Sequence, residues 1–399
     1  MILAALLAFL IRLVIIAHTH GGNDLGTYTY FARIALHGGN PFNPPAHGLF
    51  AASYANNPPI EFASFAGLLA IHDSATTLRV VFALSDLIVL MLIGFAFPWS
   101  QPRRAALLVF YGFNPLVLLW WTYWSEDKTL LFLAIVLLLW ALERDRTWFA
   151  WGVAAALAAF KFLGAFFAPV LAIHEFRRTR WRALEPIAAF ALVVLVSNAP
   201  WFPHSLDAFT RRDDRLAFNP PIHTSPTLLI SRLGLYAPFE AQLLPVLAVL
   251  CVAALLLVRR INVREAVVWS LFVSYVFLPD DDVDRLILIT LPFLLIISMS
   301  VSEWAAVWIA SLVATAASVI ATNGVPHALA AISGPLQSVF SHEGTVRSVI
   351  WTNLPTALVI AIYFAHRRRP PRPVVEVSRD GMTSALRPPR VLATKERNS

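Results

Sequence analysis

The chain has 399 residues, of which 58% are hydrophobic and only 14% are charged, and its formal net charge is +7. A mean hydropathy of +0.66 with so few charges excludes a soluble globular protein. Residues 366–399 hold nine Lys/Arg against three Asp/Glu, so most of the net positive charge lies in this C-terminal tail. The charge therefore does not indicate nucleic-acid binding.

Apolar runs of bilayer length recur along nearly the whole chain. The first, from Ile2 to Ala17, has neither a basic start nor a cleavage site, so we expect a retained helix rather than a signal peptide. The predicted fold is all-α and polytopic, with about twelve transmembrane helices. The candidate spans are residues 2–17, 78–97, 105–122, 128–142, 148–160, 162–173, 184–200, 240–258, 266–279, 286–301, 304–321 and 348–365.

The first loop, residues 18–77, is predicted to carry two helices outside the spans. One begins at Asp24, runs from Leu25 to His37, and places Tyr28 and Phe31 at helical spacing, so it can lie flat on the membrane. The other, Pro58 to Ile71, is too short for a span and starts with Pro-Pro, which favours a juxtamembrane helix.

Basic residues cluster between alternate spans, and a cytoplasmic location for all clusters puts both termini in the cytoplasm. The clusters are Arg103-Arg104, Arg144/Arg146, Arg177 to Arg182, Arg259 to Arg264 and the tail. The opposite, extracytoplasmic face then receives residues 18–77, 123–127, 201–239, 280–285 and 322–347. We expect a single membrane-embedded domain at 1–365 and a Pro-rich, disordered cytoplasmic tail at 366–399.

Residues 148–173 must leave the cytoplasmic side and return within two short helices. Helices of about 12 residues reach only about 18 Å each, which favours a broken hairpin with Lys161 at its turn. Irregular backbone at membrane depth has to line a cavity or be buried in protein, so Lys161 is predicted to face a cavity.

Three carboxylates on the predicted extracytoplasmic face are the candidate catalytic groups: Asp24, Glu126 and Asp127. Each precedes or starts a predicted helix, so the alternative role is helix capping with compensation of the helix dipole. A carboxylate level with the lipid head groups could instead take a proton from an acceptor hydroxyl.

Cationic side chains at membrane depth are the candidate phosphate ligands, because an unpartnered charge there is costly. Arg12, Arg79 and Arg285 are of this kind, and the alternatives are the ion pairs Arg12–Asp24 and Arg79–Asp86. The run Asp280 to Asp284 is expected to be a hydrated turn. His18 and His20 with Asp24 could hold a divalent cation. The outer loop with His204 and mixed charges fits a lid or an acceptor site equally.

Several short motifs follow one another along residues 1 to about 175: Arg12, Asn23-Asp24, Tyr28, Gly39-Asn40-Pro41-Phe42, Tyr54, Pro58-Pro59, Phe113-Asn114-Pro115, Glu126 and Phe160-Lys161. Their order resembles that of C-type polytopic glycosyltransferases, with family 87 and the catalytic subunit of GPI mannosyltransferase I as the closest patterns.

The resemblance implies an all-helical enzyme with its active site on the extracytoplasmic face, which is the endoplasmic reticulum lumen in a eukaryote. It implies Asp24 as the base, Glu126 or Asp127 as a second acid and Lys161 near the donor, with Tyr28 and Tyr54 in the same substrate site. The GPI family starts with Asp-x-Asp-Tyr, whereas Asp24 stands alone before Leu-Gly-Thr-Tyr28, so no metal is required by the sequence.

The expected activity is inverting transfer of a hexose, with mannose as the expected sugar, from a polyprenyl phosphate to a hydroxyl of a glycolipid, glycan or protein. The rival functions are a transporter or flippase of lipid-linked sugars and a non-catalytic membrane subunit. A transporter predicts related halves and ionisable residues near mid-bilayer, and the sequence shows no internal repeat.

Overall fold

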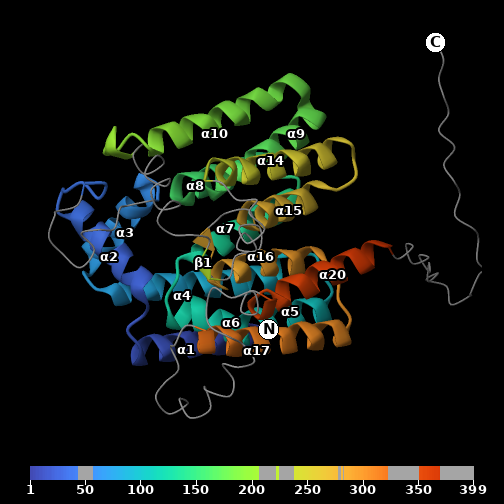
Figure 1. Ribbon diagram of the computed structural model, residues 1–399, viewed down its shortest axis with the longest axis horizontal. Coiled ribbons are helices and arrows are strands. Elements are labelled where there is room, and N and C mark those ends of the chain that lie inside the picture. Colours follow the sequence, from blue (N-terminus) through green and yellow to red (C-terminus); the bar gives the residue numbers. More distant parts are fainter. Residues whose placement is uncertain are drawn as a thin grey trace, which may run out of the picture.

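The computed structural model describes residues 1–43, 57–205, 222–223, 238–276, 280–281, 283–321 and 350–368. Most helices run side by side along one direction, and α2 and α3 lie across one end of this bundle (Figure 1). The elements are α1 (Ile2–His18), α2 (Asn23–Leu36), α3 (Pro59–Ile71), α4 (Ala75–Met91), η1 (Leu92–Ala96), α5 (Gln101–Phe113), α6 (Pro115–Val117), η2 (Leu118–Tyr123), α7 (Lys128–Glu143), α8 (Thr147–Lys161), η3 (Leu163–Phe166), α9 (Ala168–Thr179), η4 (Arg180–Ala183), α10 (Leu184–Ser197), β1 (Ile222–His223), α14 (Pro238–Leu257), α15 (Val263–Val276), β2 (Asp280–Asp281), α16 (Val283–Ile296), α17 (Val301–Ala321) and α20 (Leu354–Arg368).

The helix starts follow from local side-chain chemistry. The Ser74 hydroxyl accepts a hydrogen bond from the Thr76 amide at 3.2 Å and so caps α4. α15 and α17 begin with capping boxes, in which Asn262 pairs with Glu265 and Ser300 pairs with Glu303 through reciprocal bonds between side chain and amide. Local sequence therefore fixes where these helices begin.

Three of the described helical segments are long and apolar enough to cross a membrane: Ala75–Ala96, Gln101–Tyr123 and Val301–Val319. Others, such as Ile2–His18 and Pro59–Ile71, are shorter. The all-helical prediction is confirmed apart from one two-residue strand pair, and nearly every candidate span coincides with a helix. The count of about twelve spans is not confirmed.

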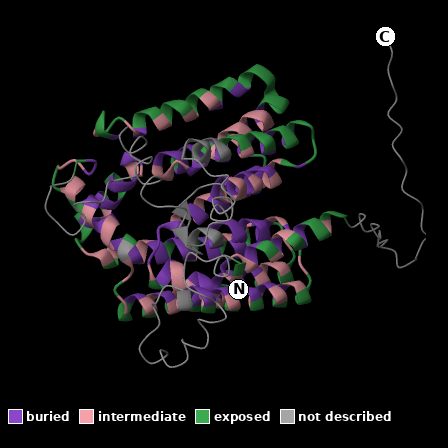
Figure 2. Ribbon diagram, in the orientation of Figure 1, coloured by how far each residue is buried: buried purple, intermediate pink, exposed green. Residues whose placement is uncertain are grey.

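The surface of the bundle is apolar where a soluble protein would be polar. Leu3 and Leu195 are 79% and 72% exposed, and most of α10 is exposed along its length (Figure 2). Arg12, Asp86 and Asp127 are instead buried inside. Apolar outside with charge inside is the arrangement that a lipid solvent favours.

The segments predicted to face opposite sides of the membrane lie at different ends of the bundle. α2 and α3 lie at one end, while the connection between α14 and α15 and the last turn of α20 lie at the other (Figure 1). Arg264 of α15 pairs at 3.1 Å with Glu143 of α7, the residue before the predicted basic cluster Arg144/Arg146. α20 continues to Arg368, so it includes the first three residues assigned to the tail, and residues 369–399 lie outside the described part.

Residues 222–223 and 280–281 form a short parallel pair, with Ile222 opposite Asp280 and His223 opposite Asp281. These residues belong to two loops that were predicted to share the extracytoplasmic face. The pairing brings the two loops together, and it is the only departure from helix among the regular elements of the described chain.

Candidate active site

A buried cluster of charged side chains lies where α2, α3, α8 and the start of α7 meet. It contains two of the three lysines of the chain, Lys128 and Lys161, together with three carboxylates. Its members are Tyr28, Glu61, Glu126, Asp127, Lys128 and Lys161. Charged groups are buried together in this way only when they compensate one another.

Asp127 is the centre of the cluster. Its carboxylate lies 2.7 Å from the Lys161 ammonium and 3.1 Å from that of Lys128, and it accepts a hydrogen bond from the Tyr28 hydroxyl at 3.1 Å. Burial raises its pKa, but the two lysines outweigh burial and hold the pKa of Asp127 below its ordinary value. Asp127 is therefore ionised and fixes both lysines.

Glu61 of α3 is the second partner of Lys161, at 3.2 Å, and is fully buried. Because α3 has only 13 residues, about 20 Å of helix, it lies outside the spanning segments. Burial raises the pKa of Glu61 to about 8, against the opposing effect of Lys161. Its Oε2 atom is buried and has no hydrogen-bond partner among the described residues.

Tyr28 connects Asp24 to the cluster. Its hydroxyl lies 3.4 Å from Glu126 and its ring lies 5.2 Å below the Lys161 ammonium. Burial first, then Asp127, Glu126 and Asp24, raise the pKa of Tyr28 well above its ordinary value. Asp24 stands one helical turn before Tyr28 and is exposed, so it forms the solvent edge of the cluster.

The capping roles considered for these carboxylates are wrong. α2 begins at Asn23 with Gly22 as its N-cap, and no side chain caps it. Asp127 is the N-cap residue of α7, yet its carboxylate makes no capping bond and faces Tyr28 and the lysines instead. Both positions still suit the helix dipole.

Two turns, each with a residue at positive φ, lie next to the two lysines of the cluster in the chain. Ser125, with φ 64°, precedes Glu126 and follows the π-helical turn η2, and Phe162, with φ 54°, ends α8 directly after Lys161. Left-handed backbone at residues other than glycine is strained and often marks functional sites. The prediction of a break at Lys161 is confirmed.

The turn after Lys161 depends on Gly164, which contacts the backbone of α8. A Cβ at Gly164 would lie 1.8 Å from the Ala154 carbonyl oxygen and 2.5 Å from the Ala158 amide nitrogen. We expect Gly164→Ala to destabilise the protein by about 3 kcal/mol or more, because only backbone movement relieves the overlap. Gly152→Ala, at an open position of α8, should leave the stability of the protein unchanged or raise it. Thermal unfolding in detergent measures both, and equal melting temperatures would contradict the prediction.

Arg79 fixes the segment of chain that precedes Glu126. Its guanidinium donates to the Ser125 hydroxyl at 2.7 Å, to the Ile16 carbonyl at 3.0 Å and to the Thr19 hydroxyl at 2.5 Å. The Gly22 amide adds a bond to the Trp124 carbonyl at 2.7 Å. Arg79 thus positions the segment that leads into the cluster. The expected pairing of Arg79 with Asp86 is wrong.

Arg12 is buried away from the cluster, with an exposed fraction of 0%. Its guanidinium donates to Asp86 at 2.6 Å and to the carbonyls of Ala8 and Gly112 at 3.0 and 2.9 Å. The expected ion pair of Arg12 with Asp24 is wrong, because Asp86 is the partner. These contacts tie α1 to α4 and α5.

The remaining predicted site residues are not assembled in the described part of the chain. Tyr54 lies outside it, and Arg285 lies in the first turn of α16 with its side chain outside it. His204 is exposed after α10. His18, His20 and Asp24 do not form a metal-binding group, and the described residues contain no such group of three.

Glu61 and Lys128 are cluster residues that the sequence analysis did not select. The available signal for Glu61 was a lone ionisable residue within an apolar helix, which marks a functional position. Two motifs of the resemblance have local roles instead. The side chains of Asn40 and Asn114 each accept a bond from the amide two residues later, at 2.9 Å, and close turns.

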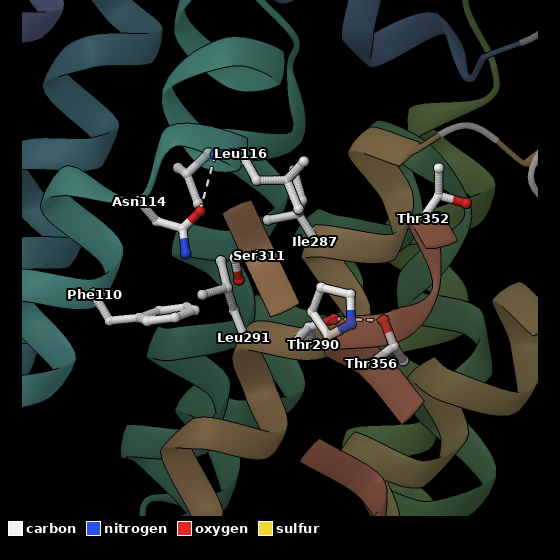
Figure 3. Close-up of a pocket in the computed structure, with 11 residues that line it drawn as sticks. Phe110, Asn114, Leu116, Ile287, Thr290, Leu291, Ser311, Thr352 and Thr356 are labelled. Carbon is white, nitrogen blue, oxygen red and sulfur yellow. Dashed lines mark hydrogen bonds between the residues drawn. The ribbon is translucent and has the colours of Figure 1, made fainter. Parts of the chain in front are cut away.

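Away from the charged cluster, a small cavity lies between α5, α6, α16, α17 and α20 (Figure 3). Its volume is about 10 Å³, about the space of one water molecule. Thr290 and Thr356 share a hydrogen bond of 2.7 Å across it. None of its described lining residues is titratable, so it does not compete with the charged cluster as a reaction centre.

No protein-family model and no curated protein sequence matches this chain. Among solved structures, it is similar to the crystal structure of ArnT from Cupriavidus metallidurans bound to undecaprenyl phosphate. The identity is 15% and the TM-score 0.38, over 91% of this chain and 76% of that one. A likeness at this level carries no functional argument, and the function is inferred from the cluster itself.

Proposed function

We propose that the protein is an integral membrane glycosyltransferase that moves a hexose from a polyprenyl phosphate sugar to an acceptor hydroxyl. One observation supports it above all. Two of the chain's three lysines meet a group of carboxylates at the bundle end that carries the surface helices α2 and α3. Cations for a phosphate and carboxylates for a hydroxyl proton are what this transfer needs.

The reaction assigns separate tasks to the two parts of the cluster. The acceptor oxygen forms a bond to the anomeric carbon while the bond from that carbon to the phosphate oxygen breaks, with inversion. The hydroxyl proton passes to Asp24, and the leaving phosphate takes the bonding electrons. The side chain of Lys161 is 16% exposed, which makes it the more accessible of the two lysines. Lys161 neutralises the phosphate and gives up its contact with Glu61.

We propose a lipid-linked donor because the cluster lies beside α2 and α3 at one end of an apolar helical bundle. Mannose is the proposed hexose, and a glycolipid, glycan or protein hydroxyl is the proposed acceptor. The proposed site faces away from the cytoplasm and both termini face into it, because the arginine clusters lie at the other bundle end. The charged cluster performs these steps with its own side chains, and no cofactor is assigned.

Asp24→Asn should reduce sugar transfer by about 10²–10⁴-fold, the range for loss of a general base, while folding is unchanged because Asp24 is exposed. The assay is transfer of labelled mannose from polyprenyl phosphate-mannose by purified protein in lipid. Asp73→Asn is the matched control, since it removes another exposed aspartate, from the link before α4, and breaks only a surface pair with Arg33. Equal activity of the Asp24 variant and the control would remove Asp24 from the mechanism.

A transporter or flippase of lipid-linked sugar is the second candidate, favoured by Glu61. A buried carboxyl with a pKa of about 8 beside a lysine can exchange a proton with each transport cycle. The cluster takes Tyr28 and Glu61 from α2 and α3, which lie at one end of the bundle, and this position favours the transferase. Sugar-lipid movement across liposomes driven by a pH gradient, with no transfer to an acceptor, would establish the transporter instead.

A further inference from the structure

A large basic cavity lies at the bundle end opposite the charged cluster. Its volume is about 620 Å³, within the range of ligand sites. It is formed by the ends of α9, α14 and α20 and the start of α15. Five arginines line it, with Glu265 as the one acidic residue among the described lining residues. The arginines are Arg177, Arg178, Arg259, Arg260 and Arg367.

The contacts of these arginines leave donors for a ligand. Arg177 gives one bond to the Leu256 carbonyl at 3.0 Å, and Arg178 pairs with Asp145 at 3.4 Å. Arg367 contacts the Tyr363 hydroxyl at 3.2 Å and the Arg260 carbonyl, and lies 3.9 Å from Glu265. A guanidinium has five N–H groups, so most of them are not used by these bonds. Asp145 and Glu265 compensate only part of the five positive charges, and a bound anion relieves the repulsion that is left.

Exposed apolar side chains stand next to cavity residues in the chain. Phe176 precedes Arg177 and contacts Trp181, which is 75% exposed, and Val258 precedes Arg259 and is 62% exposed. Tryptophan side chains prefer the level of the lipid head groups. Arginines with exposed apolar neighbours match a molecule with an anionic head and an apolar body, rather than a free ion.

We propose that the basic cavity binds the phosphate head group of an anionic phospholipid. Basic pockets between membrane helices are known sites for such head groups, and the Phe176–Trp181 pair would contact the acyl chains. The site is separate from the proposed transferase centre and stands without it.

Arg259 offers a substitution that removes charge without harming the fold. Its φ is 58°, a conformation that glycine adopts more readily than arginine, so Arg259→Gly keeps or improves the turn after α14. Arg180→Gly is the matched control. It also removes one arginine at positive φ, 53°, from the same bundle end, but Arg180 is not among the residues that line the cavity.

The experiment measures thermal unfolding of the full chain in neutral detergent as phosphatidylglycerol, phosphatidylcholine or inorganic phosphate is added. Phosphatidylglycerol should raise the melting temperature in a saturable way, and the other two should not. Arg259→Gly should weaken the apparent affinity at least fivefold, and Arg180→Gly should match the wild type. Saturable stabilisation by inorganic phosphate would make the ligand a free anion and overturn the lipid assignment. No stabilisation by phosphatidylglycerol, or equal affinities of the two variants, would overturn the site itself.

Discussion

Asp86→Leu should lower the free energy of unfolding by about 3–5 kcal/mol, the cost of leaving one member of a buried ion pair without its partner. Arg12 is 0% exposed and Asp86 1%, and the Nε–Oδ2 distance is 2.6 Å. Tyr111 also donates to Asp86, so the substitution leaves two buried donors with one fewer acceptor. Reversible unfolding in mixed detergent micelles provides the measurement.

The double variant Arg12→Leu/Asp86→Leu should be more stable than Asp86→Leu alone. Removal of both charges replaces an uncompensated cation with apolar packing, which is often nearly neutral. Ser85→Ala is the control in the neighbouring position, where a buried hydroxyl only bonds the Val81 carbonyl of its own helix. If Asp86→Leu loses no more stability than Ser85→Ala, the ion pair contributes little to the fold.

Stability should fall as the pH rises from about 4.5 to about 8, and Glu61 is the cause. Its folded pKa of about 8 lies above its ordinary value of 4.5, so the folded state holds one proton more than the unfolded state in this interval. The contribution is fully present below pH 4.5 and lost through pH 8, with a slope of roughly 1.4 kcal/mol per pH unit.

Glu61→Gln should remove this slope, because glutamine keeps the shape of the protonated carboxyl and does not titrate. Unfolding midpoints between pH 5 and 9 test it, with wild type and variant in the same detergent. Asp127, whose pKa lies below its ordinary value, affects stability only in acid, so its contribution is constant across this range. Parallel pH profiles for Glu61→Gln and wild type would contradict the assignment.

The helices could be predicted from sequence because local signals mark several of their ends. Gly38 follows the end of α2, Pro58-Pro59 marks the start of α3, and Arg259-Arg260 follow α14, whereas Arg103-Arg104 lie within the first turn of α5. The turn at Lys161 was predictable for the same reason, since two short apolar runs flank it. The lengths of the helices could be predicted less well. Turns of π-helix and 3₁₀-helix join or shorten segments whose hydropathy is uniform along the sequence.

The pairings inside the bundle could not be predicted, because they join residues far apart in the chain. Arg12 finds Asp86 and Lys161 finds Glu61, 74 and 100 residues away. A sequence shows that an ionisable residue in an apolar run needs a partner, but several partners satisfy the same charge rule. The candidates taken from the sequence, Asp24 for Arg12 and Asp86 for Arg79, were the wrong ones.

The bonds of Arg79 set a limit on how the chain can change in length. One guanidinium reaches Thr19 after the first helix and Ser125 before the seventh. Since each helical residue turns the chain by about 100°, adding or deleting a single residue in α1 would swing Thr19 to another side of the axis. Insertions between Ile2 and Thr19 are therefore expected not to be tolerated.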